Sequence, residues 1–222
     1  MNYNLLSDSI LNEDFYYYLG FYIDPRDRKT SHIFLLYKFE NEIKLIELSD
    51  NGIKDVFQIQ TLKRNLSIIA NHSIDNIPED FLKQIAPICE VILENKTTVP
   101  YNITFHSTKF NQFDGSLELH ENDYGLTCST FIMSIFESIG ITLIDIENWN
   151  YRDSDKEWQQ KVVDYLLKYK DESQANFAKQ NIGCFRFRPE EVFSTVSSDT
   201  LPCNLNHCEP LGEKIKREFF PN

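Results

Sequence analysis

Cys128 is the residue whose position most clearly suggests chemistry. It directly follows Thr127, a residue type that can cap a helix. Apolar residues then recur at helical spacing, namely Phe131, Ile132, Ile135, Phe136 and Ile139. This pattern predicts a helix with Cys128 in its first turn and Gly140 at a left-handed C-terminus. The first N–H groups of a helix stabilise a thiolate and a developing oxyanion, so the position suggests an acyl-transfer nucleophile. A small residue packed at a helix start is the alternative interpretation.

His32 is the best-placed base among five histidines. It opens an expected strand over 31–38, which pairs with 43–48 through a polar turn to form an antiparallel hairpin. His120 lies eight residues before Cys128 and is the reserve candidate. His72, His106 and His120 are otherwise expected to be surface or hydrogen-bonded strand residues.

A carboxylate on the returning strand is expected to hold the imidazole of His32. Glu47 is one candidate for this role, because an acceptor on the second ring nitrogen fixes the tautomer. A tight turn would instead bring residues 49–51 closer to His32, so Ser49 and Asp50 compete for the same role. A solvated carboxylate on a strand is the other interpretation of Glu47.

Periodic apolar residues predict further elements around these candidates. A helix is expected over 78–95, with a possible kink at Pro87, and another over about 155–170, with helical structure continuing to about 180. Short strands are expected over 101–106 and 116–120, and a closing strand over 183–188 before Pro189 begins another helical turn. No repeat or flexible linker divides the chain, so residues 1–222 are predicted to form a single α+β domain.

The composition excludes several classes of protein. Hydrophobic residues make up 41% of the 222 residues, which rules out disordered and low-complexity chains. The net charge is −12, so nucleic acid and anionic membranes are disfavoured as partners, whereas a basic protein is compatible. No apolar run is long enough to span a bilayer, and the first residues do not read as a secretory signal. A cytoplasmic location is therefore expected.

The five cysteines do not resemble a disulfide framework. They are an odd number spread through a mid-sized chain, so most are expected to be reduced thiols. Cys89 lies on an apolar helical stripe and is expected to be a small buried hydrophobe. Cys184, Cys203, His207 and Cys208 could bind zinc, but their spacing is poor, and a tail loop with reduced cysteines is preferred.

Two segments resemble one family. Tyr124-Gly-Leu-Thr-Cys128-Ser-Thr-Phe-Ile, followed by Phe136-Glu-Ser-Ile-Gly140-Ile, resembles the segment that opens the catalytic helix in NlpC-type papain-like thiol hydrolases. Ser31-His32-Ile-Phe-Leu-Leu-Tyr and Ile43-Lys-Leu-Ile-Glu47-Leu resemble the histidine hairpin of that superfamily. Val99-Pro100-Tyr101 resembles its Pro-Tyr upstream of the cysteine. The hairpin comes first here, as in the circularly permuted branch with YiiX-like proteins and lecithin:retinol acyltransferase.

The resemblance implies a permuted papain-like fold, a small antiparallel sheet packed on the cysteine helix. It also implies a cysteine peptidase or amidase that needs no cofactor, with Cys128 as nucleophile, His32 as base and Glu47 as carboxylate. Tyr101 and Tyr124 would line the substrate cleft, although either could equally pack in a core. The substrate would be a peptide, a protein or a cell-wall-derived amide.

The chain also departs from the family pattern. Thr127 stands where an Asp is usual, Thr130 where a small Gly is usual, and Phe34 where the histidine strand commonly has Gly. These bulkier residues bear on the substrate more than on the nucleophile. A non-catalytic interaction module with an acidic surface and a thiol acyltransferase acting on lipid esters are the alternative functions.

Overall fold

The computed structural model describes residues 3–4, 16–23, 31–49, 52–55, 68–71 and 77–219, and the fold below refers to these residues. His72 and Asp50, which were considered from the sequence, lie outside them.

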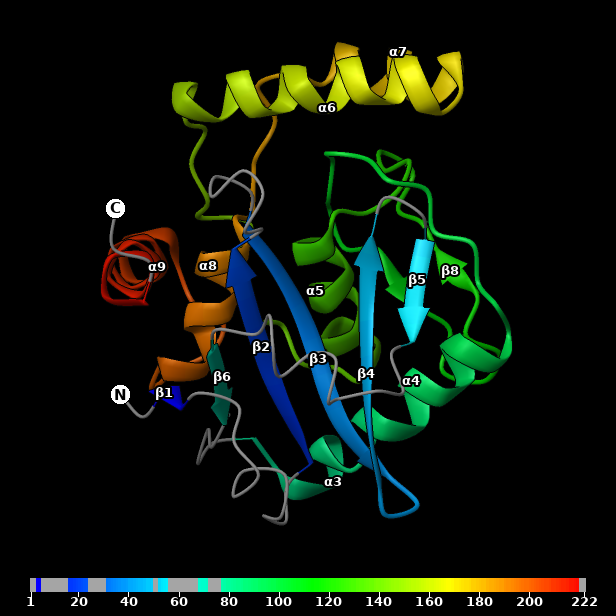
Figure 1. Cartoon of the computed structure of the whole chain (residues 1–222), viewed down its shortest axis with the longest axis vertical. Coiled ribbons are helices and arrows are strands. Elements are labelled where there is room, and N and C mark those ends of the chain that lie inside the picture. The colour runs from blue at the N-terminus through cyan, green and yellow to red at the C-terminus, as the bar shows by residue number, and fades with distance from the viewer. Residues whose placement is uncertain are drawn as a thin grey trace.

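A six-stranded antiparallel sheet forms one layer of the molecule (Figure 1). Its strand order is β1-β6-β2-β3-β4-β5. The strands are β1 (Tyr3–Asn4), β2 (Tyr17–Ile23), β3 (Ser31–Phe39), β4 (Glu42–Ser49), β5 (Gly52–Asp55) and β6 (Ile68–Asn71). Since β3 and β4 are the predicted hairpin, that element is confirmed.

The hairpin fits its sequence locally. Glu40 and Asn41, in the turn, both have positive φ, at 48° and 66°, which matches the right-handed twist of two-residue hairpins. On the neighbouring strand β2, Gly20 pairs with Phe34. A Cβ atom at Gly20 would lie 1.7 Å from the Phe34 ring, so the ring occupies the space that a side chain at position 20 would fill. The bulky Phe34 is therefore accommodated by a glycine on β2.

Helices pack on the sheet and beyond its end. They are α3 (Glu79–Leu82), α4 (Ile85–Glu94), α5 (Cys128–Ser138), α6 (Lys156–Tyr169), α7 (Glu172–Gln180), α8 (Pro189–Ser194) and α9 (Leu205–Phe219), with short 3-10 turns at Asp153–Asp155 and Thr195–Ser197. A small separate hairpin joins β7 (Lys109–Phe110) to β8 (Leu117–Glu118). The structure thus has the mixed α+β character that the sequence predicts.

The main core lies between α5 and the sheet, where α5 packs against β3 and β4 (Figure 1). Ile33 and Leu35 of β3 are fully buried in this core together with Phe131 and Phe136 of α5. The ring of Tyr17 meets the ring of Phe136 edge-on at 5.1 Å. Burial of these large side chains fixes the helix against the hairpin, and with it the relative positions of Cys128 and His32.

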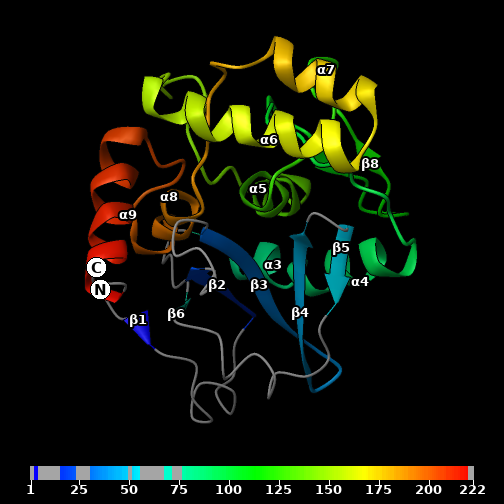
Figure 2. The same ribbon diagram turned by 45° about the horizontal axis from the view of Figure 1, so that its top comes forward.

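A second layer, made by α6 and α7, covers the end of the sheet near the start of α5 (Figure 2). It has its own small apolar cluster, formed by Ile103, Val162, Val163, Leu166, Ala175 and Ala178. Because Trp158 of α6 and Cys128 of α5 line the same cavity, this layer forms one wall of the site described below.

The helix expected over 78–95 is two helices, so the expected kink at Pro87 is wrong. The break falls at Lys83 and Gln84, between α3 and α4. Pro87 lies in the first turn of α4, where the missing N–H has no intrahelical acceptor to lose.

Two predicted strands are also wrong. Residues 183–188 have no strand partner, because side chains bind their backbone instead. Gln159 donates to the Cys184 carbonyl at 2.9 Å, and the Trp149 indole donates to the Arg186 carbonyl at 3.0 Å. Of the strand expected over 101–106, the structure has only an isolated bridge from Tyr101 to Leu126.

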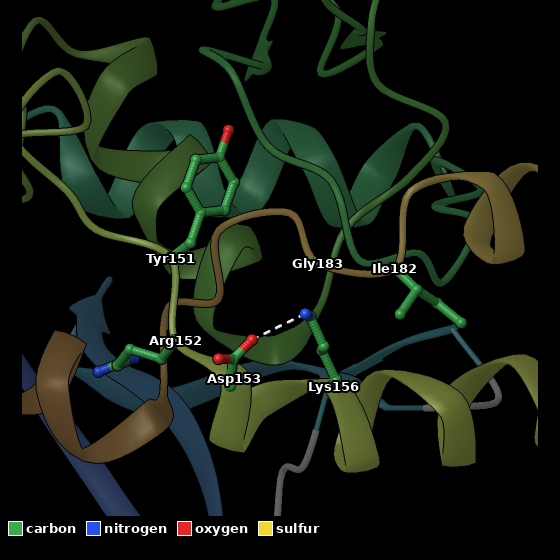
Figure 3. A pocket seen from close by; sticks show the side chains of 6 residues that line it. All are labelled: Tyr151, Arg152, Asp153, Lys156, Ile182 and Gly183. Carbon is green, nitrogen blue, oxygen red and sulfur yellow. Dashed lines mark ion pairs between the residues drawn. The ribbon is translucent and has the colours of Figure 1, made fainter.

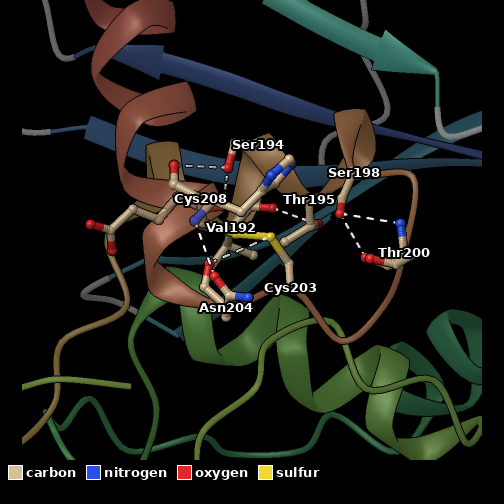
Figure 4. Close-up of a disulfide and its surroundings, with 10 residues drawn as sticks. Val192, Ser194, Thr195, Ser198, Thr200, Cys203, Asn204 and Cys208 are labelled. Carbon is tan, nitrogen blue, oxygen red and sulfur yellow. Dashed lines mark hydrogen bonds between the residues drawn. A yellow bond between two sulfur atoms is a disulfide. The ribbon is translucent and has the colours of Figure 1, made fainter. Parts of the chain in front are cut away.

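Cys203 and Cys208 are joined by a disulfide, so the expectation that both are free thiols is wrong (Figure 4). Cys208 lies in the first turns of α9, and Cys203 bridges the segment at Ile144, with its N–H bonded to the Leu143 carbonyl at 2.9 Å. The cross-link therefore ties α9 to the chain that follows α5. Within the described residues Cys89, Cys128 and Cys184 remain free.

No helix among the described residues has both the length and the apolar character needed to cross a membrane.

Candidate active site

Cys128 is the first residue of α5, and two threonines define this helix start. The backbone N–H of Thr130 donates to the Thr127 hydroxyl at 3.2 Å, and the Thr127 N–H donates to the Thr130 hydroxyl at 2.8 Å. This reciprocal pair is a capping box. The two threonines that depart from the family pattern therefore have a structural role here. The N–H groups of Cys128 and Ser129 come before the first intrahelical bonds and are available to an anion.

His32 lies at the start of β3 and interacts with two functional groups. Its Nε2 atom is 3.1 Å from Oε2 of Glu47, and both side chains are mostly buried, with exposed fractions of 15% and 12%. Its ring also shares a hydrogen bond with the Cys128 thiol. Tyr22 packs on the imidazole with ring centroids 5.1 Å apart. The Glu47 carboxylate is therefore the ion-pair partner of Nε2.

The strand register explains why Glu47 reaches His32 although it is not the residue opposite. Leu35 pairs with Ile46, and continuing that register places Ser49 level with His32. The Ser49 hydroxyl, however, donates to the Gly52 carbonyl at 3.1 Å. Glu47 lies two residues back along β4 and is long enough to reach the ring diagonally. The structure therefore brings Glu47, and not Ser49, to the imidazole of His32.

The electrostatics of the pair favour charge separation. Burial alone raises the pKa of the Cys128 thiol, but the charge and hydrogen bond of His32 and the Ile33 N–H outweigh it, so this pKa lies below its ordinary value. Burial likewise lowers the pKa of His32, but Cys128 and Glu47 together raise it to about 10. Both shifts favour a thiolate beside an imidazolium at neutral pH.

A small cavity of about 60 Å³ gives access to the pair. Its lining includes His32 and Cys128, with Tyr101, Trp158 and Phe187 as aromatic walls. Tyr101 is thus at the cavity, as its predicted role requires. Tyr124 is not among the lining residues; its ring packs against Phe177 of α7 at 5.3 Å.

A buried network of ion pairs supports the side of the cavity that Trp158 and Arg186 form. Asp155 has an exposed fraction of 2% and lies within 3.1 Å of three guanidinium groups, those of Arg152, Arg186 and Arg188. The Arg186 guanidinium also stacks over the Trp158 ring, 3.9 Å from its centroid. Arg186 and Trp158 both line the cavity, so the network fixes the distance between α6 and the segment before α8.

A larger, polar cavity of about 480 Å³ lies on the outer side of this network (Figure 3). It is lined by Tyr151, Arg152, Asp153, Lys156, Ile182 and Gly183. The ammonium of Lys156 is paired with Asp153 at 2.7 Å, and Arg152 is engaged by the buried carboxylates. Both cations that line the cavity are thus already engaged in ion pairs.

Cys184 is another free cysteine near this region, and its pKa is raised, whereas that of Cys128 is lowered. Burial raises the pKa of Cys184 to about 12, and its thiol donates to the Ile103 carbonyl at 3.4 Å. The structure does not bring together the zinc ligands considered from the sequence, because Cys203 is bonded to Cys208.

Sequence reasoning missed one cluster. His106, which precedes β7, lies close to His120 and Asp123, which lie between β8 and α5. The only local signal in the sequence was Asp123 three residues after His120. His106 is 17 residues away from Asp123 in the sequence, so no local pattern links it to the other two.

Comparisons with protein-family models, with curated proteins and with solved structures found no match.

Proposed function

We propose that this protein is a cysteine hydrolase that cleaves an amide or isopeptide bond, in a permuted papain-like arrangement. One observation carries the proposal: a thiol of lowered pKa at a helix N-terminus, paired with an imidazole that a carboxylate orients. The order of elements supports it, since the histidine hairpin precedes the cysteine helix.

The acylation step follows from these positions. The Cys128 thiolate attacks the carbonyl carbon, and the N–H groups of Cys128 and Ser129 stabilise the oxyanion that forms. When the C–N bond breaks, the imidazolium of His32 gives its proton to the leaving amine. The products of this step are a thioester on Cys128, a free amine and a neutral His32.

Hydrolysis of the thioester restores the enzyme. His32 takes a proton from water as the water oxygen attacks the thioester carbonyl, and the C–S bond breaks to release the acid. Glu47 keeps the ring in one orientation throughout, because its carboxylate stays beside Nε2.

The cavity constrains the substrate. Tyr101, Trp158 and Phe187 line the small cavity next to Cys128 and narrow the approach to its thiol. We therefore expect a small residue on the acyl side of the bond, in a peptide, a protein or a cell-wall-derived amide.

The cytoplasmic location stays a prediction. Disulfides such as Cys203–Cys208 are more common in proteins of oxidising compartments.

The test compares two free thiols in one protein. Cys184 is the more exposed and Cys128 the more buried, so accessibility alone predicts that Cys184 reacts first. The pKa shifts predict the reverse order. Iodoacetamide labelling across a pH series, resolved by peptide mass spectrometry, should show Cys128 modified rapidly at neutral pH and Cys184 only at high pH.

His32→Ala serves as the diagnostic variant and His207→Ala, at an exposed position of α9, as its matched control. In His32→Ala the labelling profile of Cys128 should move to higher pH, because burial then acts without the opposing imidazolium. If Cys128 labels no faster than Cys184 in the wild type, or if its profile is the same in both variants, the proposal is wrong.

A further inference from the structure

A second cluster of ionisable side chains lies outside the cavity of Cys128. His106, His120 and Asp123 each present one possible ligand atom, and these atoms all lie within 4.8 Å of one another. His106 precedes the β7–β8 hairpin, and His120 and Asp123 follow it. The cluster therefore lies where the two ends of this excursion of the chain meet.

Asp123 is held rigidly at the centre of the cluster. Its side chain is fully buried, and its Oδ2 accepts the His106 N–H at 3.0 Å and the Thr108 hydroxyl at 2.7 Å. Its Oδ1 faces Nδ1 of His106 at 2.8 Å. One carboxylate oxygen is thus fixed by neutral donors, while the other is directed at an imidazole.

The two imidazoles lie face to face beside this oxygen. Their centroids are 5.4 Å apart and their planes are inclined by 25°. The side chain of His106 is 42% exposed, so solvent reaches the cluster. Nδ1 of His120 accepts the Asn122 N–H at 3.2 Å, which identifies it as a nitrogen with a lone pair. If a metal ion used this lone pair, water could accept the hydrogen bond of the exposed Asn122 N–H instead.

We infer that His106, His120 and Asp123 form a binding site for a divalent transition-metal ion of the zinc type. Two imidazole nitrogens and one carboxylate oxygen are ligands that Zn²⁺ and its neighbours accept, whereas Mg²⁺ and Ca²⁺ prefer all-oxygen sites. Ligand atoms about 2.1 Å from a tetrahedral ion are roughly 3.4 Å apart. The His106–Asp123 contact of 2.8 Å would need to open by about 0.6 Å, and any ligand separation near the 4.8 Å limit would need to close by about 1.4 Å.

The ion would replace the proton between Nδ1 of His106 and Oδ1 of Asp123, and the ring would carry its proton on Nε2 instead, so that His106 binds as a neutral imidazole. Three protein ligands leave a fourth position, which water would fill. Because the ligands come from both ends of the β7–β8 excursion, the ion would cross-link those ends. Asp123 is four residues before Thr127, so the metal would also stabilise the chain that leads into the cap of α5.

The test is metal titration of tag-free, chelator-treated protein. A Cys128→Ser background removes the one thiol of lowered pKa, because a thiolate next to an imidazole is a competing soft-metal site. Isothermal titration with Zn²⁺ should give one equivalent bound. Co²⁺ should give a visible d–d spectrum without a thiolate-to-cobalt charge-transfer band.

His106→Ala and His120→Ala in that background should each weaken Zn²⁺ binding by at least about 100-fold, since changes to outer-shell partners alone cost 10–100-fold. His207→Ala is the matched control and should bind like the parent. Circular dichroism of each apo variant, and the Co²⁺ spectrum of His106→Gln, separate loss of a ligand from loss of folding. If the parent binds no metal, or if His106→Ala and His120→Ala bind as tightly as His207→Ala, the site does not exist.

Discussion

Two places in this molecule hold an imidazole against a buried carboxylate. In one, His32 lies 3.1 Å from Glu47, and in the other His106 lies 2.8 Å from Asp123. The distances are similar, but the surroundings differ. His32 is mostly buried and interacts with the thiol of Cys128, whereas His106 is 42% exposed and stacks on His120.

The difference shows that the third group determines the chemistry of such a pair. A thiol at a helix N-terminus can give its proton to the imidazole and become a nucleophile. A second imidazole cannot do so, but it adds a lone pair and completes a set of metal ligands. We therefore propose different roles for the same two residue types, a nucleophilic site in one place and a cation site in the other.

The largest effect expected is on catalysis at the first pair. Cys128→Ser and His32→Ala should each lower hydrolysis of an alanyl aminomethylcoumarin amide by a factor on the order of 10³ or more, because each removes a group that takes part in bond breaking. His207→Ala should keep the wild-type rate. A His32→Ala variant that retains a tenth of the wild-type rate would remove His32 from the mechanism.

The next effect concerns stability at the second pair. In the presence of a chelator, Asp123→Asn should lower the free energy of unfolding by about 1–3 kcal/mol, because the buried carboxylate accepts three hydrogen bonds. Chemical denaturation measures this change, and the exposed neighbour Glu121→Gln should remain within about 0.5 kcal/mol of the wild type. Equal stabilities of the two variants would mean that Asp123 does not organise this segment.

A smaller effect is expected for Glu47→Gln. The amide can still accept from the imidazole, but the charge that helps to raise the pKa of His32 is lost. We expect the alkylation rate of Cys128 at pH 7 to fall on the order of 10-fold, less than in His32→Ala. A loss as large as that of His32→Ala would show that Glu47 does more than orient the ring.

The smallest effect is the pH dependence of stability from the thiolate–imidazolium pair. The pKa of His32 is raised from 6.5 to about 10, so its contribution is complete below 6.5 and is lost as pH rises through about 10. The pKa of Cys128 is lowered from 9.0, so its contribution is present above 9.0 and is lost as pH falls through the lowered value.

The two contributions have opposite slopes, so they offset each other below pH 9 wherever both groups are titrating. Between pH 9 and about pH 10 only the His32 contribution still changes, so the difference in unfolding free energy between wild type and Cys128→Ser should decrease there, by at most about 1.4 kcal/mol per pH unit. Urea denaturation at a series of pH values measures it. A difference that rises steadily from pH 5 to pH 10 would contradict a charge-separated pair.

Local patterns were sufficient to predict the elements that hold the candidate nucleophile and base. Thr127 as the cap of α5, Gly140 at its left-handed end with φ of 78°, and the β3–β4 hairpin are all as expected. Caps, turns and side-chain periodicity depend on neighbours within a few residues, which the sequence contains directly. The strand expected over 183–188 failed because distant side chains, including that of Gln159, bind its backbone.

The sequence by itself therefore determined that a helix begins at Cys128, that a strand with His32 near its start begins at Ser31, and that carboxylates lie nearby. Only the tertiary structure decided that Glu47 rather than Ser49 meets the imidazole, that Tyr124 packs on Phe177, that Cys203 bonds to Cys208, and that His106, His120 and Asp123 converge. Each of these depends on strand register, on a side-chain direction or on chain closure over a loop. Those quantities are fixed by burial of the whole core, which no short stretch of sequence specifies.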